Sequence, residues 1–247
     1  MDISIEKINN IYFSHGRTAF KFGLDILNID KNDEILVPSF ICDVALHPLI
    51  QKKIIIKFYE LDNHFQPCWD SLKKLISKKT KALLMVNYFG RAIFIEDYCK
   101  FCENNNIKLI EDNCHGFNGY YKEKLLGTFG DIGFTSPRKF LDIVGGGILY
   151  TKNQNYINLQ TLSKFKDDNF YYNFKNKLKN LIKKNKSLNN FYRKIRNLNR
   201  PPYEDMNYFK EDMIKDYILG DASKEKINKE ILNNKLKIRI KNYNYWH

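Results

Sequence analysis

A lysine lies shortly before a glycine-rich segment in the middle of the chain. Lys139 stands within residues 136–141, and three consecutive glycines follow at 145–147. Upstream, the apolar stretch 107–110 is followed within two residues by Asp112. A lysine amine can condense with an aldehyde, and a carboxylate can keep a pyridine nitrogen protonated. Pyridoxal phosphate needs both groups from its protein. The order and spacing of Lys139 and Asp112 therefore favour a pyridoxal phosphate site.

Strand and helix patterns alternate through the first 153 residues. The predicted strands are 35–38, 54–59, 82–86 and 107–110, and the predicted helices are 69–78 and 94–104. Unbroken apolar strands separated by helices are typical of a mostly parallel sheet covered on both faces. Ligands bind such sheets beyond the carboxyl ends of the strands. Asp112 and His115 follow such an end, so both are expected at the ligand site.

The bulk properties indicate a soluble protein of the cytoplasm. The 247 residues suffice for one domain, or for one domain with an appendage. No apolar run reaches the length of a membrane span, and the first residues lack the profile of a signal peptide. The five cysteines are odd in number and lack the spacing of a disulfide framework, which suits a reducing compartment.

The only paired cysteine motif is formed by Cys99 and Cys102. Such a pair could be half of a zinc site or a redox couple. No second pair accompanies it, and it falls inside the predicted helix 94–104. We expect two buried or half-buried helix cysteines, and no metal.

The region after residue 153 has a different character. It holds 21 Lys and Arg against 10 Asp and Glu, so most of the net positive charge of the chain lies here. Residues 171–200 carry apolar side chains every three or four positions, which predicts a long amphipathic helix, and 211–247 predict one or two more polar helices. The favoured interpretation packs the long helix on the rest of the protein or on a second subunit. Peripheral contact with an anionic membrane stays open, whereas a nucleic-acid partner is not expected because no binding motif accompanies the aromatic residues.

Six collinear segments carry a family resemblance. They are 15–20, 33–40, 86–90, 110–116, 126–133 and 136–139 running into the glycines at 146–147. With them the chain resembles the DegT-like (StrS-like) sugar aminotransferases, which are fold-type I pyridoxal-phosphate enzymes. The resemblance implies an α/β large domain with a mixed, predominantly parallel seven-stranded sheet over residues 1–153, followed by a helical, basic region over 154–247. It also implies a homodimer, glutamate as amino donor, and a nucleotide-linked keto-sugar for surface polysaccharide as substrate.

The resemblance also assigns roles to individual residues. Lys139 falls on the lysine that holds the cofactor and moves the proton, Asp112 on the partner of the pyridine nitrogen, and His115 on the neighbour of the phenolic oxygen. The remaining roles are the phosphate turn and the contact above the ring. The phosphate turn comprises Gly16, Arg17 and Thr18, with a hydroxyl from either Thr135 or Ser136, and the ring contact falls on Cys42 or, as a substitute, Phe40.

The end of the sequence departs from the family pattern. Residues 235–247 resemble the helix that enters a small C-terminal domain, which this chain is expected to lack. The Asn-x-Arg element that reaches the neighbouring subunit's phosphate is not recognisable. The alternative to an aminotransferase is therefore a catalytically inactive, pyridoxal phosphate-binding or partner subunit. Sugar dehydration ranks lower, because relatives with that activity replace the lysine that Lys139 matches.

Overall fold

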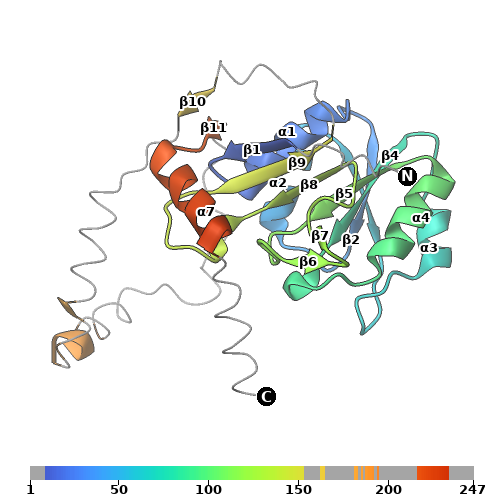
Figure 1. Ribbon diagram of the computed structural model, residues 1–247. Coiled ribbons are helices and arrows are strands. Elements are labelled where there is room, and N and C mark those ends of the chain that lie inside the picture. Colours follow the sequence, from blue (N-terminus) through green and yellow to red (C-terminus); the bar gives the residue numbers. More distant parts are fainter. Residues whose placement is uncertain are drawn as a thin grey trace.

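A single large sheet organises the molecule in the computed structural model (Figure 1). The structure describes residues 9–152, 162–164, 181–182, 185, 187–191, 194 and 216–233. In this part of the chain the sheet has nine strands in the order β10-β11-β1-β9-β8-β5-β4-β2-β3. The strands are β1 (Asn9–Phe13), β2 (Glu34–Pro38), β3 (Ile55–Tyr59), β4 (Thr80–Val86), β5 (Lys108–Asp112), β8 (Ile132–Thr135), β9 (Gly147–Thr151), β10 (Ser163–Lys164) and β11 (Tyr217–Ile218).

The pairing is mixed and mostly parallel. Strands β3, β2, β4, β5 and β8 form parallel neighbours, and β9 runs antiparallel between β8 and β1. The short strands β10 and β11 are parallel to each other and extend the sheet beyond β1, to which β11 is antiparallel. The α/β fold with a mixed, mostly parallel sheet is thus confirmed. The seven longer strands, which lie side by side in the order β1-β9-β8-β5-β4-β2-β3, form the expected seven-stranded core.

Helices cover both faces of the sheet. They are α1 (Gly16–Ile26), α2 (Asp43–Gln51), α3 (Trp69–Lys74), α4 (Ile95–Asn105) and α7 (Asp221–Asn233), with the short 3-10 turns η1 (Tyr88–Gly90) and η2 (Pro137–Lys139) and the hairpin β6 (Tyr120–Tyr121)–β7 (Lys124–Leu125). Figure 1 shows α3 and α4 together at one side of the sheet and α7 beyond its opposite edge.

The alternation of side chains along each strand explains the two layers. In β2, Ile35 and Val37 join the core under α1 and α2, whereas Leu36 joins the core under α3 and α4. Successive strand residues point to opposite faces, so a strand covered on both faces is apolar throughout. Each fully buried aliphatic side chain contributes about 1.5–3 kcal/mol of transfer free energy.

Most predicted elements appear within one or two residues of their expected limits, and one is shorter. The helix predicted for 69–78 ends at Lys74. The next residues form a polar turn in which Ser77 N donates to Thr80 Oγ1 at 2.9 Å and Thr80 N donates to Ser77 O at 3.1 Å. These local bonds replace the helical ones and allow β4 to begin at Thr80.

The basic region is only partly described. The helix predicted over 171–200 lies mostly outside the described residues, as do 235–247. Within the predicted polar helices of 211–247, the structure contains α7, which packs against the rest of the fold through Ser223 and Ile227. No described helix combines the length and the apolarity needed to cross a bilayer.

Candidate active site

The sequence-predicted site residues collect at one edge of the sheet. Strands β1, β2, β4, β5 and β8 run in the same direction, because β1 and β8 are both antiparallel to β9 and the others are parallel to β8. Their carboxyl ends lead into the segments that carry Gly16, Phe40, Tyr88, Asp112 and Lys139, respectively. Five connections that are distant in sequence therefore meet at one edge, as expected for a ligand site of this architecture.

A cavity of about 530 Å³ lies at this edge. Its walls combine polar side chains with an apolar portion from α1, α2 and the β2–α2 loop. Of the predicted site residues, Gly16, Arg17, Phe40, Cys42, Asp112, His115, Ser136 and Lys139 line it. Thr18 and Thr135 are fully buried and are not part of the wall.

Asp112 forms a buried acidic wall of the cavity. It is the last residue of β5, and its Oδ1 accepts a hydrogen bond from Cys114 N at 2.9 Å. Burial raises the pKa of this carboxyl, whereas the Cys114 hydrogen bonds and the positive charges of Lys139 and His115 act in the opposite direction. A cation or an N–H⁺ group entering the cavity would stabilise the ionised form of Asp112 further.

Lys139 lies at the end of the turn η2. Its backbone N–H donates to Ser136 O at 3.1 Å, and its side chain is exposed and faces the cavity. Its charge opposes the rise in the pKa of Asp112. The two groups are therefore electrostatic neighbours across one cavity, although they are far apart in the sequence.

His115 stands nearby on the loop after β5. Much of this side chain remains in contact with solvent. Partial desolvation and the charge of Lys139 lower the pKa of His115, and the charge of Asp112 opposes them. The lowered pKa favours a neutral imidazole at neutral pH, which can donate one hydrogen bond and accept another.

The start of α1 is suited to an anion. Its N-cap residue, His15, makes no side-chain capping bond. The first backbone N–H groups and the positive end of the dipole of a helix favour an anion at its start. A Cβ atom on Gly16 would lie 3.1 Å from Cys114 Sγ and 3.4 Å from Ser136 Cβ. Gly147 packs even closer, since its Cβ would lie 2.2 Å from His15 O. The glycine run after Lys139 thus permits close contact with the helix-opening turn.

The sequence left two residue pairs open, and the structure shows how the members of each pair are placed. Thr135 Oγ1 donates to Asn113 O at 2.9 Å, whereas Ser136 lines the cavity. Both Cys42 and Phe40 are exposed at the cavity wall. Phe40 belongs to an aromatic group with Phe65 and Tyr88, at ring-centroid distances of 5.9 and 5.8 Å.

Sequence reasoning missed the hydrogen bonds that support this edge from the opposite face of the sheet. The Glu111 side chain is fully buried, and it accepts hydrogen bonds from Asn87 Nδ2 at 2.7 Å, Gly127 N at 2.6 Å and Phe129 N at 2.8 Å. Burial raises the pKa of Glu111, and these donors oppose the rise. Asn113 continues the network, because its Nδ2 donates to Gly116 O and Leu126 O. The network fixes the loop that carries His115.

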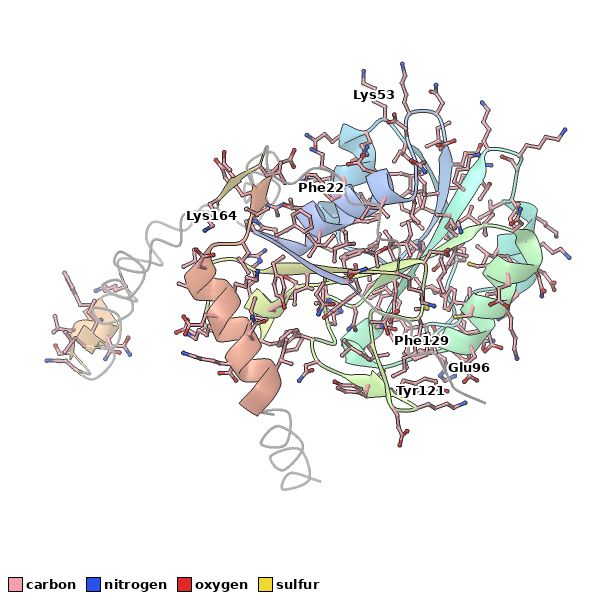
Figure 2. All side chains as sticks on the ribbon, turned by 45° about the horizontal axis from the view of Figure 1, so that its top comes forward. Phe22, Lys53, Glu96, Tyr121, Phe129 and Lys164 are labelled. Carbon is pink, nitrogen blue, oxygen red and sulfur yellow. The ribbon has the colours of Figure 1, made fainter. Side chains whose placement is uncertain are left out.

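The same loop is held at its outer end by the hairpin β6–β7. Tyr121 packs on Phe129 with ring centroids 6.0 Å apart, and Lys122 Nζ lies 2.6 Å from Glu96 Oε1 on α4 (Figure 2). This ion pair is exposed, and such pairs contribute roughly 0–1 kcal/mol. The buried network is therefore the stronger anchor.

Further residues that were not predicted also line the cavity, among them His15, Tyr88, Phe89 and Arg138. Tyr88 Oη donates to Phe40 O at 2.6 Å and so ties the β4 loop to the β2 loop. These four lie within the segments that carried the resemblance, and this position was the available signal.

Cys99 and Cys102 pack into the core under α3 and α4. Cys99 is half-buried and Cys102 is buried on α4, as expected for packed helix cysteines. Burial raises the pKa of both thiols. Among the described residues, no group of three His, Cys, Asp or Glu side chains could hold a metal ion.

Comparisons with known proteins identify the family and the relatives of the chain. The model of the DegT/DnrJ/EryC1/StrS aminotransferase family matches residues 5–186. The chain is 30% identical over 120 residues to the GDP-perosamine synthase of Vibrio cholerae, covering 48% of this chain and 33% of that protein. It is 31% identical over 129 residues to the GDP-4-keto-6-deoxy-D-mannose 3-dehydratase of Escherichia coli O55:H7, covering 51% and 33%. The chain thus spans about a third of the length of these curated relatives.

Solved structures show the same fold. A structure of the E. coli GDP-4-keto-6-deoxy-D-mannose-3-dehydratase with bound hydrated PLP superposes with a TM-score of 0.54 at 26% identity, covering 67% of this chain and 49% of that chain. The X-ray structure of an aminotransferase from Psychrobacter cryohalolentis gives a TM-score of 0.54 at 21% identity, covering 59% and 38%.

Proposed function

Because the chain belongs to the DegT/DnrJ/EryC1/StrS aminotransferase family, we propose that it is a pyridoxal phosphate-dependent aminotransferase that acts on a nucleotide-linked keto-sugar in surface polysaccharide synthesis. The observation that carries the proposal is the meeting of Lys139, Asp112 and the start of α1 around one cavity. An amine, an acid and an anion-binding helix start are the three groups that this cofactor needs.

The cavity fits the cofactor in size and in donor set. Ligand sites for small molecules have volumes of roughly 300–1,000 Å³, and this cavity measures about 530 Å³. Gly16 packs closely against Cys114 and Ser136, so the start of α1 and the Ser136 side chain lie side by side at the cavity. The buried Asp112 supplies an acceptor whose charge needs a positive partner, as a protonated pyridine nitrogen would be.

Each residue then has a distinct task. Lys139 Nζ would hold the cofactor through its aldehyde and move a proton at the substrate carbon. Asp112 would hold the proton at the pyridine nitrogen, and neutral His115 would contact the phenolic oxygen. The backbone N–H groups of Gly16, Arg17 and Thr18 and the Ser136 hydroxyl would bind the phosphate. When bound, the cofactor supplies the electron sink for amino-group transfer.

The proposal also includes the amino donor, the cell compartment and the oligomeric state. Glutamate would donate the amino group, the protein would act in the cytoplasm, and a second copy of the chain would complete the site. The exposure of Phe40 and Phe89, at 61% and 70%, supports a partner surface at the cavity mouth. Residues 1–153 would form the cofactor-binding unit. The later elements β11 and α7 pack against this unit.

A second candidate reaction is dehydration of the keto-sugar. The similarity to a 3-dehydratase at 31% identity favours it. The presence of Lys139 favours transamination instead, because an amine at this position can hold the cofactor covalently. The reaction products distinguish the two, since transamination adds nitrogen to the sugar and dehydration removes one oxygen.

The test is visible absorption of the full chain mixed with pyridoxal phosphate. We expect a lysine-linked cofactor band in the wild type and in Lys100→Ala, an exposed control on α4, but not in Lys139→Ala. Glutamate should bleach the band, and a GDP-linked keto-sugar should then yield an amino sugar by mass spectrometry. A folded wild type without any band would refute cofactor binding, and a band that persists in Lys139→Ala would refute the role of Lys139.

A further inference from the structure

The loop that follows Lys139 rests on α7. Ile227 of this helix is fully buried, and it belongs to a cluster that includes residues of the loop and of β9. The buried members are Phe117, Ile143, Ile148, Tyr150, Leu219 and Ile227, and the half-buried Phe140 and Leu141 pack against them. A segment that comes much later in the chain thus forms the floor under the lysine loop.

Polar contacts fix α7 on both sides of this cluster. Lys226 Nζ donates to Asp142 O at 2.5 Å, across 84 residues of sequence. On the other side, Tyr12 Oη donates to Asn228 Oδ1 at 3.0 Å, and Lys224 Nζ lies 5.1 Å from the centre of the Tyr12 ring. The helix therefore bridges the lysine loop and strand β1.

The backbone bonds of the loop itself are local. They include turn bonds from Leu141 N to Pro137 O at 2.9 Å and from Ile143 N to Leu141 O at 3.0 Å. The loop rejoins the sheet where Gly146 N donates to Ser14 O at 2.6 Å. Between η2 and this point, Ile143 lies in the cluster, and the half-buried Phe140 and Leu141 pack against it. A Cβ atom on Gly146 would lie 3.5 Å from Ile227 Cδ1, so the helix contacts the loop at its far end as well.

We infer that Ile227 is a positioning residue for Lys139. It acts through the loop and does not itself line the cavity. Removing its side chain would leave a cavity beneath Ile143 and Gly146 and free the loop to move. The consequence for cofactor binding rests on the proposed function, whereas the consequence for the loop does not.

Hydrogen exchange and cofactor titration of the full chain test the inference. The test variant is Ile227→Ala, and the control is Ile231→Ala, which removes the same side chain from a position on α7 that is 36% exposed. Without cofactor, amides 140–146 should exchange about tenfold faster in Ile227→Ala, while amides 80–86 of β4 keep the wild-type rate. With pyridoxal phosphate, the dissociation constant should rise about tenfold, and the pH midpoint of the visible band should shift. Ile231→Ala should change neither.

Three results would overturn the inference. They are unchanged exchange at 140–146 in folded Ile227→Ala, equal acceleration at 80–86, and a control that behaves like the test variant. Should Ile227→Ala fail to fold, Ile227→Val serves in its place, with an expected acceleration of about threefold confined to 140–146. If the wild type binds no cofactor, the proposed function fails, and the exchange rates alone decide the inference.

Discussion

Replacing Glu111 by glutamine should destabilise the protein although the side chain keeps its shape. Wild-type Oε1 accepts hydrogen bonds from Asn87 Nδ2 and Gly127 N, and Oε2 accepts one from Phe129 N. Glutamine has only one acceptor oxygen. In its better orientation it keeps the first two bonds and turns its NH₂ group toward the Phe129 N–H, so that two donors face each other.

The magnitude follows from these three bonds. An unsatisfied buried donor costs about 1–3 kcal/mol, and the two remaining bonds each lose roughly 1 kcal/mol when their acceptor becomes neutral. Burial of the charged Glu111 is itself unfavourable and raises the pKa of this carboxyl. Glutamine carries no charge, and the removal of this cost offsets part of the loss. We expect the free energy of unfolding at pH 7 to fall by about 2–4 kcal/mol. For a chain of this size, a loss of about 3 kcal/mol lowers Tm by roughly 6–12 °C.

Urea and thermal unfolding of Glu111→Gln measure the effect, with Glu103→Gln as the control. Glu103 is an exposed glutamate on α4, and its replacement should change stability by less than about 0.5 kcal/mol. If Glu111→Gln proves as stable as the control, then Glu111 is not an ionised acceptor of three bonds. The network would then contribute little to holding the His115 loop.

Three further predictions concern other parts of the fold. Lys57, Ser77 and Thr80 donate to Glu34 and lower its pKa, so this carboxylate stabilises the protein above pH 4.5 and the contribution disappears as the pH falls through the folded-state pKa. Urea unfolding should find Glu34→Gln less stable than the wild type at pH 7, with the gap closing on acidification; a constant gap would contradict this. Gly147→Ala should cost about 1–3 kcal/mol or more and weaken pyridoxal phosphate binding, because its Cβ would meet His15 O at 2.2 Å; wild-type binding would contradict the contact. Leu84→Ala should cost about 2–5 kcal/mol in thermal unfolding, since its side chain is fully buried, and a loss under 1 kcal/mol would indicate that the core closes around the gap.

The first half of the fold was predictable because its strands are apolar and its helices amphipathic. Strands β8 and β9 were not predicted from their own pattern, and both contain a glycine that strands usually avoid. A Cβ atom on Gly133 would lie 2.0 Å from Gly127 O, so the approach of two backbone segments requires glycine there. Helix α2 was missed as well, since it contains Pro48, which disfavours a helix locally and is accommodated by the packing of Leu49 in the core.

The residues of the candidate site also divide into those that the sequence predicted and those that it did not. Lys139, Asp112 and the turn at Gly16 could be named because each stands in a local motif. The contacts of Glu111 and Ile227 could not, because partners such as Gly127 for Glu111 and Ile143 for Ile227 are distant in the sequence and no local pattern marks them. Sequence patterns reveal the residues that touch a ligand more readily than the residues that hold them in place.

Strand β5 shows why the chemistry and its support are nevertheless linked. Ile110 joins the core under α1, Leu109 joins the core under α4, and the alternation continues to the end of the strand. Asp112 therefore faces the cavity on the α1 side, while Glu111 binds the 127–129 loop on the other side. A shift of one residue in the pairing of β5 with β4 would exchange the two carboxylates between the faces. The register pairs Met85 with Glu111 and Val86 with Asp112. It thus places Asp112 at the cavity and Glu111 at the 127–129 loop together, and neither carboxylate could change its face without the other.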